Sequence, residues 1–196
     1  MKKLDFRVFK TSGFMSTNTS FFKIKNETYI IDPGYGVKKY VGEVPVHVLL
    51  THGHFDHIAG LEELNVIDVF ISNEDKEMLT DPNKNFSYLF GEKFTFYGNT
   101  KNIDEYFSTI KVPGHTFGSR LIVIENLIFT GDTVFCNSIG RSDLGGSREY
   151  MKETIKKLKD FFFNINENSL ILPGHGDICS VRDLIRINPF FKRGLV

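Results

Sequence analysis

The sequence predicts a layered α/β domain, and three observations support this fold class. Runs with strand-like alternation fill the first thirty residues, helical patterns then alternate with apolar β-branched runs, and the same order repeats in the second half. Of the 196 residues, 41% are hydrophobic and 24% are charged, as in an ordinary globular protein. The chain contains no Pro/Ser-rich linker, low-complexity segment or repeat, so we expect a single domain over residues 1–196.

The first half of the chain is predicted to begin with a strand meander that ends at the turn sequence at 32–34. Apolar residues alternate before that point, and a turn at 26–27 separates two of the runs. Over 81–106, aromatic residues are mixed with turn residues, and we expect short helical and irregular pieces there. The remaining predictions are strands at 4–8, 21–24, 28–31, 46–50 and 69–72, and helices at about 58–64 and 73–79.

The clearest helix lies in the second half. Ser147 is a typical N-cap residue, and apolar residues follow it at spacings of four, three and four, which places them on one helical face. These residues are Met151, Ile155, Leu158 and Phe162. A last helix over 181–187 is expected to stop before Pro189, because proline cannot continue a helix. The strands predicted in this half are 108–112, 121–124, 127–130 and 169–172.

Composition excludes several classes of protein. The 24 basic residues are balanced by 24 acidic ones, which argues against a nucleic-acid binder, since such a protein needs a basic surface. No apolar run approaches the roughly eighteen residues of a membrane span, and no apolar segment follows the N-terminal lysines, so we expect neither a membrane helix nor a secretory signal. Cys136 and Cys179 lie far apart and do not form a disulfide framework. We therefore expect free thiols and a cytoplasmic protein.

The strongest functional signal is the sequence THGHFDH at 51–57. His52 and His54 are two residues apart, so in an extended segment both rings point to the same side. Asp56 and His57 follow as the chain turns into a helix. Histidine and carboxylate side chains are common metal ligands, and four of them within six residues indicate a metal site. The alternative for this motif is a helix cap with solvated histidines.

Three further ligand-type residues share one sequence context, in which an apolar strand is followed by a glycine and then by the ligand. They are His115 in KVPGHTFGS, Asp132 in LIFTGDTVF and His175 in LILPGHGD. Glycine allows the sharp turn and the close backbone approach that present a side chain at the end of a strand. Each alone is weak, since a turn aspartate or a loop histidine is an equal alternative. Together with the first motif they bring seven ligands to one edge of the core. They leave out only His47, which we expect to be a half-buried strand histidine.

Seven ligands are too many for one tetrahedral ion, so the sequence predicts two divalent ions. The set divides into His52, His54 and His115 at one ion, and Asp56, His57 and His175 at the other, with Asp132 bridging both. Two ions about 3.5–4 Å apart would lower the pKa of a bridging water and polarise an attacked carbonyl or phosphoryl oxygen, which is the chemistry of hydrolysis. Asp56 is the candidate catalytic residue, because it can orient the nucleophile or accept its proton. Zinc is expected, and iron or manganese suit the same ligands.

In their order and context these residues resemble the metallo-β-lactamase superfamily. Within it, GDTVFCNSIGRSDLGG at 131–146 and RINPFF at 186–191 are similar to the small single-domain relatives of glyoxalase II. The resemblance covers nearly the whole chain. It implies a four-layer αββα sandwich with the metal site at one edge between the two sheets, and hydrolysis of a small-molecule thioester of the hydroxyacylglutathione type. A thioester suits the ligand set for a further reason, because a thiolate leaves with little help from a proton donor.

Several alternatives stay open beside this resemblance. Iron-dependent persulfide dioxygenases share the GRSD-like stretch and use a single iron, while lactonases and β-lactamases share the metal motif. Glutathione as the thiol carrier is open too, because we expect no counterpart here of the C-terminal helical region that binds it in glyoxalase II. Arg141 and Asp143 either contact substrate or, as we favour, pair to brace their loop. A non-enzymatic alternative is a metal-stabilised binding module, and the substrate-binding residues stay unassigned.

Overall fold

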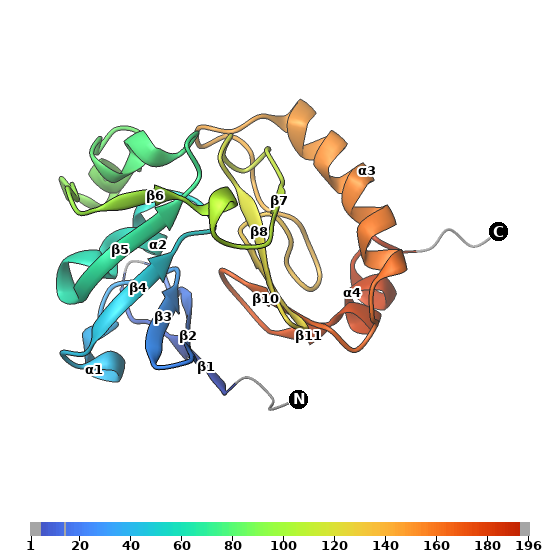
Figure 1. The fold of residues 1–196 in the computed structure, drawn as a ribbon. Helices are drawn as coiled ribbons and strands as arrows, with labels where there is room; N and C mark the ends of the chain where they lie inside the picture. Colours follow the sequence, from blue (N-terminus) through green and yellow to red (C-terminus); the bar gives the residue numbers. More distant parts are fainter. Residues whose placement is uncertain (1–4, 14, 193–196) are drawn as a thin grey trace. The chain divides into compact units, whose positions relative to one another are not determined.

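The structure is a computed structural model that describes residues 5–13 and 15–192. It divides into two compact units, a first unit that ends at Tyr106 and a second unit that begins at Phe107. Each unit contains one β-sheet together with helices (Figure 1). The predicted mixed α/β class is thereby confirmed, while a single domain over 1–196 stays a prediction. Among the described residues, no helix has the length and apolar character needed to cross a membrane.

The sheet of the first unit has six strands in the order β1-β2-β3-β4-β5-β6. The first three form the antiparallel meander that the alternating sequence predicts, and β3 to β6 are parallel. The strands are β1 (Phe6–Lys10), β2 (Asn18–Ile24), β3 (Glu27–Ile31), β4 (Pro45–Leu49), β5 (Asn65–Ile71) and β6 (Thr100–Asn102). The helical elements are α1 (Lys38–Val41), α2 (Phe55–Ile58) and the 3-10 turns η1 (Ala59–Glu63), η2 (Lys76–Leu79), η3 (Ser87–Phe90) and η4 (Ile103–Glu105). Leu4, predicted to begin the first strand, lies outside the described residues.

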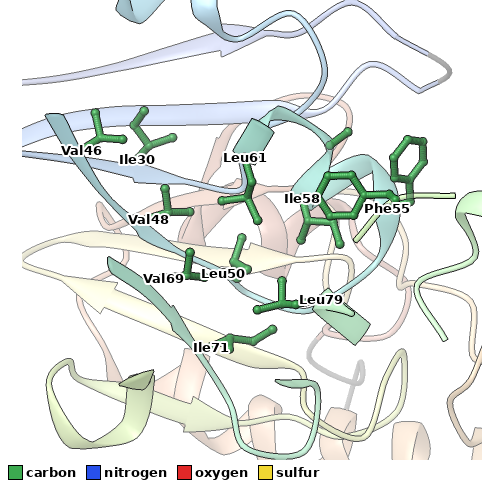
Figure 2. Close-up of a cluster of buried hydrophobic side chains, with 12 residues drawn as sticks. Ile30, Val46, Val48, Leu50, Phe55, Ile58, Leu61, Val69, Ile71 and Leu79 are labelled. Carbon is green, nitrogen blue, oxygen red and sulfur yellow. The ribbon is translucent and has the colours of Figure 1, made fainter. Parts of the chain in front are cut away.

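Apolar side chains of the central strands form the core of the first unit (Figure 2). Val46 and Val48 alternate along β4 and are fully buried, as is Leu50 just beyond the strand. Ile58 of α2 and Leu61 of η1 pack in the same cluster, and each is at most 1% exposed. A parallel strand is covered on both faces, which explains the nearly continuous apolar run in β4. This packing holds in place the end of β4 and the THGHFDH segment that follows it.

Two helices of the first unit differ from the predictions. The helix predicted at 58–64 begins earlier, as α2, and continues as the 3-10 helix η1. The Gly60 N–H donates a 2.8 Å hydrogen bond to the Pro33 carbonyl oxygen, and a Cβ on Gly60 would lie 2.6 Å from the Gly34 carbonyl oxygen. Contact with the loop after β3 therefore decides the backbone at this point. The polar helix predicted at 73–79 is only the turn η2, and α1 has no counterpart among the predictions.

The sheet of the second unit has five strands in the order β11-β10-β9-β8-β7. Strands β9 and β10 are parallel, and the other neighbours are antiparallel. The strands are β7 (Thr109–Lys111), β8 (Arg120–Ile124), β9 (Leu127–Gly131), β10 (Leu170–Pro173) and β11 (Cys179–Ser180). The helices α3 (Arg148–Asn164) and α4 (Val181–Ile187) confirm the two predicted helices, while the short β11 has no counterpart among the predictions.

Helix α3 packs on this sheet with the face that its periodicity predicts. Ser147 is the N-cap residue, and its hydroxyl accepts a 3.4 Å hydrogen bond from the Tyr150 N–H. The four predicted apolar residues are all buried, in one cluster with Leu121 of β8 and Ile128 of β9. A cap and an amphipathic face are both local in the sequence, which is why this helix could be predicted.

Replacing Phe162 by alanine is expected to lower the free energy of unfolding by about 3–5 kcal/mol. The Phe162 ring is 1% exposed and lies against Phe191, with the ring centroids 5.3 Å apart, so the change leaves a cavity in the core. Urea denaturation followed by circular dichroism measures the loss. Lys156→Ala, on the exposed face of the same helix, is the matched control and should change stability by less than about 0.5 kcal/mol. Equal losses in the two variants would contradict the packing role.

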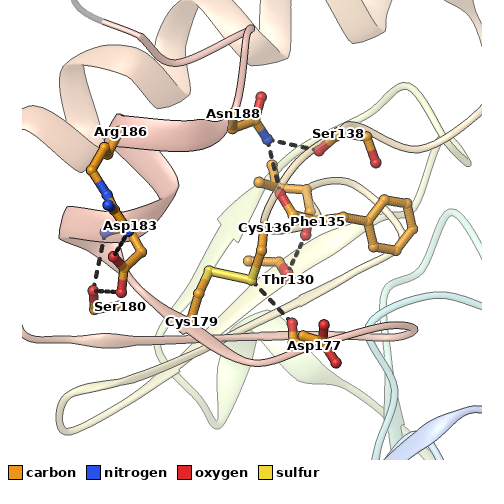
Figure 3. Close-up of a disulfide and its surroundings, with 11 residues drawn as sticks. Thr130, Phe135, Cys136, Ser138, Asp177, Cys179, Ser180, Asp183, Arg186 and Asn188 are labelled. Atoms are coloured by element: carbon orange, nitrogen blue, oxygen red, sulfur yellow. Dashed lines mark hydrogen bonds and ion pairs between the residues drawn. A yellow bond between two sulfur atoms is a disulfide. The ribbon is translucent and has the colours of Figure 1, made fainter.

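The cysteines correct one prediction. Cys136 and Cys179 are joined by a disulfide, with their Cα atoms 6.0 Å apart, and are not free thiols (Figure 3). Their separation of 43 residues in the sequence is misleading, because the parallel pairing of β9 and β10 brings together the segments that follow the two strands. The expectation of a cytoplasmic location loses this support and stays a prediction.

Candidate metal centre

The THGHFDH segment connects β4 to α2 in the first unit and gathers its histidines. The ring centroid of His52 lies 4.8 Å from that of His54 and 4.1 Å from that of His57. The Nε2 atom of His57 is 3.5 Å from Oδ2 of Asp56. The three histidines are at most 6% exposed, and His54, although it is the N-cap residue of α2, makes no side-chain capping hydrogen bond. The alternative of a helix cap with solvated histidines is therefore wrong.

Asp32, which the sequence analysis did not assign to the site, orients two of these histidines. Its Oδ2 atom is 3.0 Å from Nδ1 of His57 and accepts a 2.6 Å hydrogen bond from the Thr51 hydroxyl. The Thr51 hydroxyl oxygen is in turn 3.1 Å from Nδ1 of His52. A carboxylate oxygen at this distance favours the hydrogen on Nδ1 of His57, and we infer that tautomer. Because the Thr51 hydroxyl donates to Asp32, its oxygen accepts from Nδ1 of His52. Both rings then present the Nε2 lone pair to a cation.

One signal in the sequence pointed to Asp32. It directly follows the apolar strand β3, as the predicted ligands follow their strands, but here the glycine comes after the acidic residue and not before it. The structure adds what the sequence lacks, because the Asp32 N–H donates to the Leu49 carbonyl oxygen at the end of β4. Pairing of the parallel strands β3 and β4 thus places Asp32 beside the segment that carries the histidines.

Gly53 allows the chain to pass closely between His52 and His54. A Cβ at Gly53 would lie 2.6 Å from the Cβ of Met78, closer than two such atoms can approach. The Gly53 N–H donates a 3.1 Å hydrogen bond to the buried carboxylate of Asp75. The motif therefore needs glycine here for space, and Asp75 fixes the backbone between the two rings.

The residues of the first unit fit a divalent cation. His52, His54 and His57 are buried ligand-type side chains, and the Asp56 carboxylate lies beside His57. Imidazole and carboxylate are donors that zinc, iron and manganese accept. Burying so many polar groups is costly unless each finds an interaction, and binding a cation provides one. This donor chemistry supports the predicted metal site within the unit, and it leaves the identity of the metal open.

The other three predicted ligands converge in the second unit. Oδ2 of Asp132 lies 3.4 Å from Nε2 of His175 and 3.8 Å from Nε2 of His115. Asp132 directly follows β9 and His175 closely follows β10, so the parallel pairing of these strands brings them together. Gly114 and Gly131, which precede two of the ligands, have φ values of 152° and 47°, as expected of glycines at a sharp turn.

The loop that contains Arg141 orients His115. The backbone carbonyl oxygen of Arg141 lies 2.8 Å from Nδ1 of His115. Because a carbonyl oxygen only accepts, Nδ1 of His115 carries the hydrogen and Nε2 is left to face Asp132. The Arg141 side chain pairs with Asp143 through two hydrogen bonds of 2.6 and 2.7 Å. These bonds lower the pKa of Asp143 to about 2. The pairing agrees with the predicted bracing role, and a contact of either residue with substrate stays a prediction.

His47 lies apart from the ligands, as predicted. It is a partly buried residue in the middle of β4, with Nδ1 3.2 Å from Oδ2 of Asp68 on the neighbouring strand. Its ring stacks on Tyr29, with centroids 5.2 Å apart. These contacts are cross-strand packing, and none of them involves a predicted ligand.

Comparisons with known proteins show which family this chain resembles. A family model described as metallo-beta-lactamase superfamily matches residues 12–66, which include the THGHFDH segment. The probable metallo-hydrolase YqgX of Bacillus subtilis is 31% identical over 202 residues, which cover 92% of this chain and 94% of YqgX. The hydroxyacylglutathione hydrolase GloC of Haemophilus influenzae is 25% identical over 212 residues, which cover 96% of this chain and 99% of GloC.

Solved structures give the same result for the fold. The BLEG-1 B3 metallo-beta-lactamase superposes with a TM-score of 0.81 at 27% identity, covering 96% of this chain and 100% of BLEG-1. The di-iron-bound form of TTHA1623 superposes with a TM-score of 0.76 at 25% identity, covering 92% of this chain and 98% of TTHA1623.

Proposed function

This chain belongs to the metallo-β-lactamase superfamily of metallohydrolases, and on that premise we propose that it is a binuclear hydrolase that cleaves small-molecule thioesters, of the glyoxalase II type. The observation that carries the proposal is the set of buried histidines held by Asp32 and Thr51, since such oriented imidazoles are typical of metal ligands. The likeness to GloC over nearly its whole length supports the thioester as the substrate class.

We assign the ligands as the sequence predicts. His52, His54 and His115 would hold one ion, Asp56, His57 and His175 the other, and Asp132 would bridge the two. Within each unit the distances between these residues support the assignment. Zinc is our first expectation, and the di-iron form of TTHA1623 shows that a similar protein holds iron.

The residues of the chain divide the work of hydrolysis. The two ions, held by these ligands, would lower the pKa of a water and polarise the carbonyl of the substrate. The Asp56 carboxylate, partly exposed beside the buried His57, orients that water and accepts its proton. The thiolate leaves without a proton donor, so the site needs no further acid. An amide nitrogen must be protonated before it leaves, so this site suits a thioester better than an amide.

The proposal is tested with the full chain loaded with zinc. We expect hydrolysis of S-D-lactoylglutathione or of another member of a thioester panel, measured as release of free thiol. His47→Ala, a histidine outside the ligand set, should keep that activity. Failure on all thioesters would contradict the substrate class. Parallel assays on lactones, on β-lactams and, with iron-loaded protein, of oxygen uptake with glutathione persulfide identify the alternative.

A further inference from the structure

The disulfide lies in the same part of the second unit as two of the proposed ligands. Cys136 follows Asp132 by four residues, and Cys179 follows His175 by four residues. The disulfide therefore connects the two segments that extend from the ligands at the ends of β9 and β10. It closes a small ring in which the paired strands form one side and the disulfide the other.

The two connected segments differ in exposure. The Asp132 segment is fixed by hydrogen bonds of its own: the Thr130 hydroxyl donates to the Val134 carbonyl oxygen at 2.6 Å, and the Asn188 amide donates to the Phe135 carbonyl oxygen at 2.9 Å (Figure 3). On the other side, residues 176–178 are exposed. The disulfide links this exposed segment, which begins after His175, covalently to the Asp132 segment.

A cavity gives access to the disulfide. It has a volume of about 580 Å³ and is lined by both cysteines, by His175 and by Ile178, among others. Cys136 is 8% exposed, whereas Cys179 is partly exposed. Cys179 is thus the more exposed of the two cysteines, and we take its sulfur as the point of attack. Exposed disulfides are the ones that undergo exchange, while enclosed ones are inert.

The structure also contains an acceptor for the reduced state. Sγ of Cys136 lies 3.0 Å from the carbonyl oxygen of Asp177 (Figure 3). A disulfide sulfur has no hydrogen to donate, but once the two sulfurs have separated a Cys136 thiol has this carbonyl oxygen close by as an acceptor. The reduced form is thus accommodated at the buried sulfur.

We propose that Cys136–Cys179 is a thiol-exchange site, which a low-molecular-weight thiol reaches through this cavity and which controls how firmly His175 is held. The thiolate of the small thiol attacks Sγ of Cys179, forming a mixed disulfide and releasing Cys136 as a thiolate, which takes up the proton lost by the small thiol. The thiolate of a second small thiol attacks the sulfur of the first small thiol in the mixed disulfide. The Cys179 thiolate is released and takes up the proton of the second thiol. Two small thiols are oxidised to one disulfide, and the protein disulfide is reduced by two electrons.

The consequence for the metal rests on the proposed function. With the bond open, residues 176–178 are no longer tied covalently to the Asp132 segment. His175 then holds its ion less firmly, and we expect zinc to dissociate about tenfold faster, the lower end of the effects seen when the support of a ligand is lost. A thiol product of thioester hydrolysis belongs to the same chemical class as the proposed reductant.

The experiment uses zinc-loaded full-length protein incubated with 2-mercaptoethanol under native conditions. Alkylation and mass spectrometry count the open thiols, and a chromophoric chelator follows zinc release in the same samples. We expect both cysteines to become alkylated, a mixed disulfide at Cys179 to come first, and zinc release to accelerate. Ile178→Trp, which covers the approach to Cys179, should slow the exchange, whereas Ile178→Ala should not.

The Cys136→Ser/Cys179→Ser variant is the matched control, because it should release zinc at the faster rate with and without thiol. If the native protein resists alkylation while the unfolded chain is readily reduced, the exchange site is overturned. If the thiols open and zinc release is unchanged, the control of His175 is overturned. If the oxidised protein binds no zinc at all, it is the proposed function that fails, and alkylation alone decides the exchange site.

Discussion

The Asp132→Ala variant is expected to lose both metal ions at once. Asp132 is the carboxylate on which His115 and His175 converge, at 3.8 and 3.4 Å from its Oδ2 atom, and in the proposed assignment its two oxygens are shared between the ions. Removing it takes one ligand from each ion. Because the ions would supply several kcal/mol of the lowering of the barrier, kcat/KM for a thioester should fall by at least about a thousandfold.

Metal analysis of the purified variant, beside the thioester assay, decides the outcome for Asp132. Asp160→Asn is the matched control, since it changes an exposed carboxylate on α3 of the same unit, outside the ligand set and its supporting loop. It should keep both ions. Loss of only one ion in Asp132→Ala would refute the bridging role, even if activity were lost as well.

The second large effect is expected at Asp32. Asn fits the position, because it has nearly the same shape and, like Asp, tolerates the left-handed backbone that Asp32 adopts with φ of 51°. Its amide, however, lacks the charge that holds the Nδ1 hydrogen of His57 and, through Thr51, that of His52. The rings can then turn their lone pairs away from the ion. We expect Asp32→Asn to weaken metal binding by about 10- to 100-fold.

Competition with a chelator measures this change in affinity, and circular dichroism shows that the variant is folded. Asp68→Asn offers a close control, because Asp68 is also buried, also faces a histidine and also lies in the first unit. It should leave metal affinity unchanged. An equal effect at both positions would mean that loss of any buried charge weakens metal binding. That result would refute the orienting role of Asp32.

The sequence by itself determined the features that depend on neighbours along the chain. Ser147 and four apolar residues predict α3 correctly, because a cap and a helical face need only local residues. The meander before Asp32 follows from alternation in the same way. The ligand-type residues were recognisable too, since three of them share one strand-glycine context and four lie in a single motif. That His47 is not one of the proposed ligands likewise follows from its position inside a strand.

Only the tertiary structure decided which distant residues meet. The parallel pairing of β3 with β4 places Asp32 against His57, and that of β9 with β10 places Cys136 against Cys179. Neither pairing can be predicted from the local sequence. Parallel strands are joined by long crossover connections, and the residues of such a connection do not indicate which strands become neighbours. For the same reason the helix at 58–64 departs from its predicted form, since a contact with the Pro33–Gly34 loop sets its backbone. Local propensity specifies the elements, whereas strand pairing and close packing specify the orienting carboxylate and the disulfide.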